Sequence, residues 1–158
     1  MEILSFFEWL APSFLATISK AYGGTFAVIQ MFHLLGLAVM GGMVLLSDLR
    51  LLGIVMRDVP SEIVVENTNR WFTIALIVLI ATGIFMSSAV ALKLYYNEMF
   101  WGKMIGGLIG VLFVYFIKRP LLSQDHSTLK PSTIRSVAIT SIIIWFSVAA
   151  SGRWIGFS

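Results

Sequence analysis

One stretch of the sequence decides the fold: GGTFAVIQMFHLLGLAVMGGMVLLS, from Gly23 to Ser47. It contains no Asp, Glu, Lys or Arg, and as a helix rising about 1.5 Å per residue it can cross a hydrocarbon core of about 30 Å. Residues 71–92, 99–117 and 136–155 have the same character, with Lys103 interrupting the third stretch and Arg153 near the end of the fourth. Because backbone groups in lipid must be satisfied within their own segment, the sequence predicts an all-α, integral membrane four-helix bundle.

The composition supports a single membrane domain. Of 158 residues, 58% are hydrophobic and only 12% are charged, whereas a soluble domain has about 25% charged residues. The length accommodates one bundle over residues 1–158 with no soluble domain beside it. The absence of Cys excludes disulfides and thiolate metal sites. The net charge is +3, and the charged residues lie between the apolar runs. They therefore indicate membrane topology, and no nucleic-acid partner is expected.

Residues 1–20 differ from a cleaved signal peptide. Glu2 and Glu8 occupy the place of a basic segment, and Pro12 interrupts the apolar run. Apolar residues recur at helical spacing, so we expect a retained helix in the membrane interface, broken at Pro12.

The basic residues predict the orientation. The two longer loops and their flanks carry Arg50, Arg57, Arg70, Lys118, Arg119, Lys130 and Arg135, and the opposite side carries Lys20, Lys93, Lys103 and Arg153. The positive-inside rule then places both termini in the periplasm of a bacterial cytoplasmic membrane. The sequence Pro60-Ser61-Glu62 predicts that the second long helix begins before the membrane.

Three ionisable side chains lie within the hydrophobic zone: His33, Lys103 and Arg153. A charge at mid-membrane costs about 2.5–3.5 kcal/mol, so each is a candidate functional group. His33 follows Gly23 by about ten residues, which places it near the midplane. Lys103 lies near the start of its helix and Arg153 near the end of its helix, on the side of the membrane that carries both termini.

The polar residues share helix faces with small residues. At 100° per residue, one stripe of the first long helix carries Gln30, His33, Gly36, Met40, Ser47 and Asp48. Gly106, Gly107 and Gly110 share a face with Lys103. We expect these faces to point into the bundle.

An imidazole at mid-membrane, a flat space beside it and two cations above it together favour haem b. His33 would be the axial iron ligand, Gly36, Gly106, Gly107 and Gly110 would give the porphyrin clearance, and Lys103 and Arg153 would bind the propionates. Alternatively, His33 bonds a neighbouring helix, the glycines serve helix packing, and the two cations extend to the interface.

The second iron ligand stays open. Met86, Met40, Lys103 or a second protomer's His33 could supply it, or the iron could be five-coordinate. His126 falls in a loop and is interpreted as an ordinary loop residue. Asp48 could pair with Arg70, Arg135 or Lys118, and a structural ion pair is favoured over a proton relay.

Two motifs carry a family resemblance: FHLLGLAVMGGMVLLSDLRLLG, residues 32–53, and SGRWIGF, residues 151–157. Through them the chain resembles a family of uncharacterised bacterial four-helix membrane proteins. More remotely, His33 and the run Phe100 to Lys103 resemble membrane-embedded protoporphyrinogen oxidases and copper-resistance D proteins. The former resemblance implies a haem-b histidine on the first long helix. The spacing from Trp101 to Lys103 is one residue shorter than in that family's pattern.

These observations lead to one functional hypothesis and two alternatives. The hypothesis is a haem-b protein for electron transfer or redox sensing, with a quinone or soluble donor. The alternatives are a cofactor-free assembly subunit and a porphyrinogen-oxidising enzyme. Outward-facing Met and Phe side chains also predict a homo-oligomer or a partner within a membrane complex, in addition to the lipid bilayer.

Overall fold

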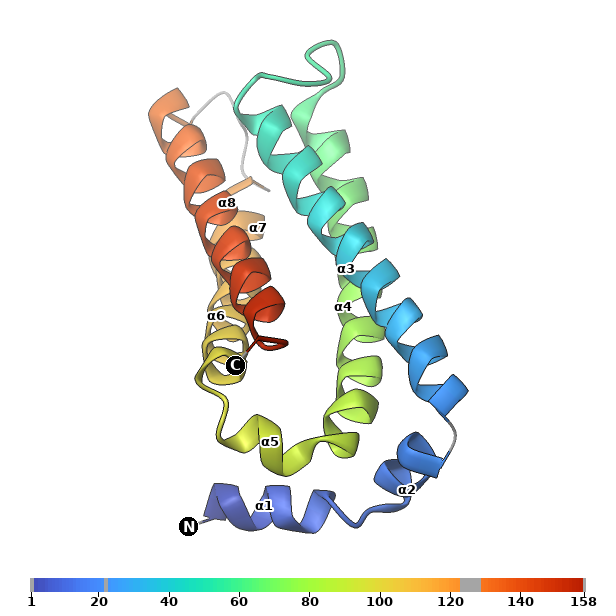
Figure 1. Ribbon diagram of the computed structural model, residues 1–158. Coiled ribbons are helices and arrows are strands. Elements are labelled where there is room, and N and C mark those ends of the chain that lie inside the picture. The colour runs from blue at the N-terminus through green and yellow to red at the C-terminus, as the bar shows by residue number, and fades with distance from the viewer. Residues whose placement is uncertain (1, 22, 123–128, 158) are drawn as a thin grey trace.

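The computed structural model describes residues 2–21, 23–122 and 129–157, and these residues form an all-helical bundle. Within them, four helical segments are long and apolar enough to cross a membrane. They are α3 (Gly23–Leu51), α4 (Ser61–Ala89), the continuous run of α6 (Glu98–Leu112), η1 (Phe113–Lys118) and α7 (Arg119–Leu122), and α8 (Pro131–Trp154). The predicted four-helix membrane architecture is confirmed, and the chain is a multi-pass membrane protein (Figure 1).

The long helices extend past their apolar stretches on the side of the two longer loops. α3 continues through Asp48 to Leu51, and the third span continues past Ile117 to Leu122. α4 begins at Ser61, directly after Pro60, as expected for a helix that starts before the membrane. The 29 residues of α3 span about 44 Å at 1.5 Å per residue, which exceeds the hydrocarbon core. Hydropathy therefore located the spans but not their ends.

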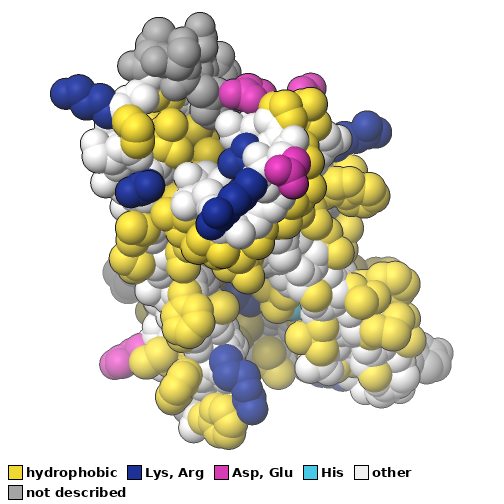
Figure 2. Space-filling view, turned by 90° about the horizontal axis from the view of Figure 1, so that it is seen from above, with side chains coloured by type: hydrophobic (Ala, Val, Ile, Leu, Met, Phe, Trp, Pro, Cys, Tyr) yellow, Lys and Arg dark blue, Asp and Glu magenta, His cyan; other side chains and the backbone are white. Residues whose placement is uncertain are grey.

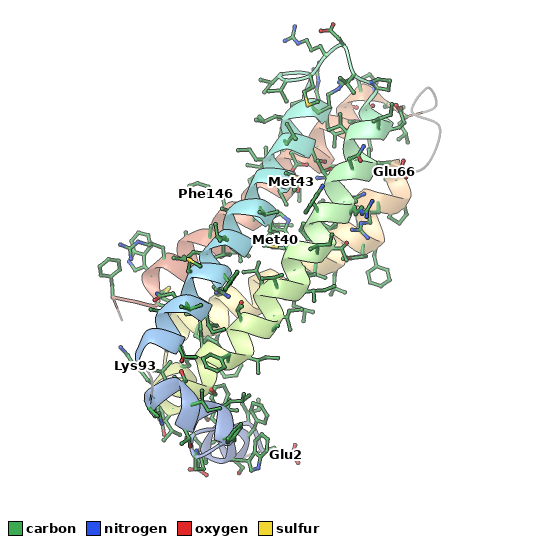
Figure 3. The ribbon with its side chains drawn as sticks, turned by 90° about the vertical axis from the view of Figure 1, so that its right-hand side faces the viewer. Glu2, Met40, Met43, Glu66, Lys93 and Phe146 are labelled. Atoms are coloured by element: carbon green, nitrogen blue, oxygen red, sulfur yellow. The ribbon has the colours of Figure 1, made fainter. Side chains whose placement is uncertain are left out.

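The four spans associate as two pairs: α3 packs against α4, α6 packs against α8, and α3 also contacts α8. A buried cluster joins the pairs and consists of Met40, Val44, Phe72, Ala75, Leu79, Val114, Trp145 and Val148. Figure 3 places Met40 at mid-height on α3, with Glu66 toward one end and Lys93 toward the other. The outward faces expose large apolar side chains such as Ile77, Phe116 and Phe146, as expected for a surface solvated by lipid.

Short helices cover the end of the bundle that carries both termini, here called the terminal end. α1 (Glu2–Leu10) and α2 (Phe14–Ala21) lie across it, with the predicted break around Pro12 (Figure 1). Phe7 and Leu10 are buried against α5 (Ala91–Tyr95). The Asn97 side chain accepts a hydrogen bond from Phe100 N at 3.0 Å, which caps α6.

One feature of the third span has no counterpart in the sequence-based prediction. Residues Phe113–Lys118 form a π-helix between two α-helical segments. A π segment inserts an extra residue into the helix and so rotates the following side chains relative to an uninterrupted α-helix. Lys118, the last residue of the segment, is only 3% exposed. The expectation that Lys118 belongs to a polar loop is therefore wrong, while His126 lies outside the described residues.

Candidate functional site

His33 lies on α3 and faces α4, where its ring meets a threonine and a glycine. Its Nδ1 atom is 2.8 Å from Thr82 Oγ1. A Cβ placed on Gly83 would lie 3.6 Å from His33 Cε1, an ordinary van der Waals distance, so the ring packs directly against this turn of α4. The imidazole is half-buried. Figure 2 shows histidine surface at the edge of a hollow between neighbouring parts of the molecule.

The hydrogen bonds of Thr82 determine which imidazole nitrogen carries the proton. The Thr82 hydroxyl is 2.6 Å from the Val78 carbonyl oxygen, one helical turn earlier, and donates its only proton there. With that donor assignment the hydroxyl accepts at its other contact, and we assign the proton of His33 to Nδ1. In the neutral ring the lone pair then resides on Nε2. This is the arrangement found in metal-binding histidines, whose second nitrogen donates to a fixed acceptor.

Lys103 from the other helix pair approaches His33. It lies near enough to the imidazole for an electrostatic interaction. Its aliphatic chain runs along α8, since a Cβ placed on Gly152 would lie 3.5 Å from Lys103 Cδ and 3.9 Å from Nζ. His33 and Lys103, separated widely in sequence, are thus brought into one region to which all four spans contribute.

The other candidate ligands occupy different surroundings. Met86 is partly buried one turn beyond Thr82 on α4, so it remains close to the His33 region. Met40 is 6% exposed within the main apolar cluster. Arg153 is exposed, and its guanidinium carbon lies 4.5 Å from the centre of the Phe157 ring. The structure therefore brings Lys103, but not the Arg153 guanidinium, toward His33.

The candidate glycines mostly serve close helix contact. A Cβ on Gly36 would meet Leu79 at 3.3 Å, one on Gly106 would meet Val148 at 3.0 Å, and one on Gly110 would meet Trp145 at 2.9 Å. Side chains of α4 and α8 thus fill the space beside these three glycines, and the expected open groove along Gly106 and Gly110 is absent. Gly107 alone among the four has no neighbour within 4 Å.

Asp48 and Lys118 form a buried ion pair at the opposite end of the bundle. Lys118 Nζ is 2.5 Å from Asp48 Oδ1, and the two side chains are 4% and 0% exposed. Of the three cations considered as partners for Asp48, Lys118 is the one it contacts. The stripe of α3 that carries Gly36, Met40, Ser47 and Asp48 is buried as expected, whereas Gln30 is exposed.

A family model described as a family of unknown function, DUF6644, matches residues 6–158. The chain belongs to this family. Searches among curated proteins and among solved structures found no significant match. The expected membership in an uncharacterised family is confirmed, and the comparisons give no support to the remoter resemblance to porphyrinogen oxidases or copper-resistance proteins.

Two residues that make these polar contacts in this DUF6644 chain are not singled out by its sequence. The sequence places Thr82 within an apolar span and does not show that its hydroxyl lies 2.8 Å from His33 Nδ1. Lys118 was counted as a loop cation because it follows the last apolar residue of the third span. A hydroxyl within an apolar helix is a weak signal for Thr82. Nothing in the sequence marks the π segment that carries Lys118.

Proposed function

We propose that this protein binds haem b through His33 and serves electron transfer or redox sensing in a bacterial cytoplasmic membrane. The observation that carries the proposal is the Thr82–His33 hydrogen bond of 2.8 Å, which leaves the Nε2 lone pair for iron. A haem supplies four nitrogen ligands of its own and needs only axial ligands from the protein. Among the described residues no three metal-ligating side chains gather, so a single histidine suits haem better than a bare ion.

The surrounding residues have separate tasks in this proposal. Thr82 would hold the imidazole ring in one orientation, and the ring packs beside Gly83. Lys103, a cation approaching from α6, would bind a propionate. The faces of Gly106 and Gly110 would not hold the haem, because Val148 and Trp145 fill them. Bound haem would supply one-electron exchange between ferric and ferrous iron.

The second axial ligand is assigned by proximity. Met86 lies on the same face of α4 as Thr82, one turn nearer the terminal end, whereas Met40 is packed within the apolar cluster. Met86 is therefore the better choice, because Lys103 as a cation would bind a propionate and has no lone pair for iron. In the proposed orientation the terminal end faces the periplasm, and an electron donor such as a quinone would approach His33 from the lipid.

A cofactor-free assembly subunit is the second candidate function, and one observation favours it. The contacts of Gly36, Gly106 and Gly110 are those of glycines that allow helices to approach closely. The His33–Thr82 bond would then connect α3 to α4 without further chemistry.

Visible absorption spectroscopy separates these two functions. The protein is expressed with haem precursors, purified in mild detergent and measured in oxidised and dithionite-reduced form. We expect a Soret band that is lost in His33→Ala and in His33→Gln. Lys103→Met is expected to retain the band with weakened haem retention. Lys93→Met, which changes an exposed lysine of the same end, is the matched control and should bind haem like the wild type.

The folded state of each variant is checked by circular dichroism and gel filtration. A folded wild-type protein with no Soret band under haem-replete expression would rule out the haem function and leave the assembly role. A Soret band retained in folded His33→Ala would remove His33 as the iron ligand.

A further inference from the structure

Polar residues from all four spans meet at one level near the end opposite the termini, here called the loop end. These residues form the loop-side polar layer: Ser47 and Asp48 of α3, Thr68 and Asn69 of α4, Lys118 of η1 and Ser141 of α8. Apolar residues bound the layer on both sides. The main cluster lies toward the terminal end, and Leu51, Val65, Leu122 and Ala138 form a second cluster toward the loops.

The layer contains more hydrogen-bonding capacity than the described residues use. Asp48 Oδ1 pairs with Lys118, and Ser141 lies beside the same carboxylate. Ser47 Oγ is buried and makes no hydrogen bond with another described residue, while Asp48 Oδ2 and Ser141 Oγ are buried beside each other and have no further partner among the described residues. Asp48 and Ser141 are 0% exposed and Ser47 is 3% exposed. Buried polar atoms of this kind are costly unless a further partner satisfies them.

A small void lies next to the ion pair and has the size and lining of a water site. Its volume is about 10 Å³, and its polar lining residues are Ser47, Thr68, Asn69 and Lys118. A buried water needs roughly this volume and two to four polar partners. Lys118 retains N–H groups not used by Asp48, and the Thr68 hydroxyl donates to Val64 O, so its oxygen can accept. Asn69 is partly exposed, which gives the void a route to the surface.

We propose that this void binds one water molecule and that the water makes the Asp48–Lys118 pair a proton-exchanging site. The Lys118 proton shared with Asp48 transfers to the carboxylate, so that an Nζ–H bond breaks and an Oδ1–H bond forms. Neutral Lys118 then takes a proton from the water in the void, so that an O–H bond breaks as a new Nζ–H bond forms, and the same water oxygen receives a proton from hydronium of the acidified aqueous phase through the opening beside Asn69, which forms its O–H bond again. The net change is the uptake of one proton from water at the loop end.

The charges around the pair suit this exchange. η1 contributes Lys118, α8 contributes the neutral Ser141, and α4 contributes the neutral Thr68 and Asn69. The nearby cation Arg119 is engaged elsewhere, donating to Asn69 O at 3.0 Å and to Thr73 Oγ1 at 2.8 Å. Because the apolar cluster around Leu51 and Leu122 closes the direct path to the loops, the proton enters beside Asn69.

Infrared spectroscopy of the full chain in lipid nanodiscs tests the proposal. On acid titration we expect a protonated-carboxyl band that shifts when H₂O is replaced by D₂O while the protein stays folded. The band should be lost in Asp48→Asn and retained in Asp58→Asn, the matched control for an exposed loop carboxylate. Should Asp48→Asn not fold, Asp48→Glu assigns the band by moving it to the glutamic-acid frequency.

The double variant Thr68→Val/Asn69→Leu keeps the ion pair and replaces two polar residues that line the void. We expect it to slow the isotope shift of the carboxyl band relative to the wild type. Isotope exchange as fast as in the wild type would overturn the role of the void. A carboxyl band that appears only on unfolding, or that persists in folded Asp48→Asn, would overturn the proton-exchanging site as a whole.

Discussion

Two polar regions occupy the same pair of helices, α3 and α4, and they differ in whether the protein pairs their charged groups internally. At the loop end, Asp48 is fully buried and paired with Lys118 at 2.5 Å. Toward the terminal end, His33 is half-buried and bonded to Thr82, and its Nε2 makes no hydrogen bond with another described residue. The first region has its charges matched internally, whereas the second presents a lone pair and a nearby cation, Lys103.

The difference teaches how burial separates structural from ligand-binding polar groups in a membrane bundle. A charge deep among apolar side chains persists only with a partner from the same protein, since neither lipid nor bulk water can solvate it. A neutral imidazole with one nitrogen satisfied can remain half-exposed at small cost. It can therefore offer the other nitrogen to a ligand. Stability is expected to depend on the loop end and ligand binding on the terminal end.

The largest expected effect comes from removing one charge of the buried pair. Lys118→Met leaves the Asp48 carboxylate unpaired and should lower the free energy of unfolding by about 3–5 kcal/mol. The double variant Asp48→Asn/Lys118→Met removes both charges and should recover most of that loss. Equilibrium unfolding in mixed micelles of increasing SDS content measures the change.

Lys93→Met is the control for this series, because Lys93 is exposed at the terminal end and its replacement should change stability little. If Lys118→Met unfolds no more easily than Lys93→Met, the pair contributes nothing and the comparison between the two ends fails.

A smaller effect is expected from the glycines between α6 and α8. Gly110→Ala would place a Cβ 2.9 Å from Trp145 Cζ2, and overpacking of this kind costs about 1–3 kcal/mol. Gly107→Ala meets no atom within 4 Å and carries the same gain in helix propensity. The difference in unfolding free energy between the two variants therefore isolates the contact with Trp145.

If both glycine variants are equally stable, α6 and α8 do not pack as described. A loss of haem binding in Gly107→Ala alone would place the porphyrin against the open glycine.

The sequence predicted the elements well because lipid imposes a simple rule. An uncharged stretch long enough to cross the core must be helical, so all four spans, the early start of α4 at Pro60 and the break at Pro12 were found. Helix ends were less accurate, because charged residues such as Asp48 and Lys118 were taken to mark the membrane boundary. In the structure these two charges neutralise each other inside the bundle, so the helices continue past them.

The candidate site was predicted only in part, because helical spacing describes one helix at a time. Helical spacing placed His33 on an inward face, and the structure brings Lys103 close to it. Spacing cannot show which side chains of other helices fill a glycine face, and Val148 and Trp145 occupy the one assigned to the porphyrin. The π segment and the Thr82 contact depend on helix packing, which no single-helix pattern contains.

The smallest expected change in unfolding free energy comes from replacing one of two threonines of α4. Thr82 lies toward the terminal end and Thr68 lies at the loop end, so the two replacements compare the ends directly. Thr82 and Thr68 each donate to the carbonyl one turn earlier, at 2.6 Å and 2.7 Å. Valine at either position removes one hydroxyl of the same kind, and each change should alter the unfolding free energy by only about 0.5–1.5 kcal/mol. The stability readout should therefore hardly distinguish them.

Haem binding should distinguish them clearly. Thr82→Val removes the acceptor of His33 Nδ1–H, and loss of such a partner typically lowers metal affinity by about 10–100-fold. Thr68→Val leaves His33 unchanged, so titration of the apoprotein with haem, followed at the Soret band, should give wild-type affinity. Equal affinities in the two variants would mean that the Thr82 hydroxyl does not orient the ring. The tautomer argument for His33 as an iron ligand would then lose its basis, whatever the stability of the loop end.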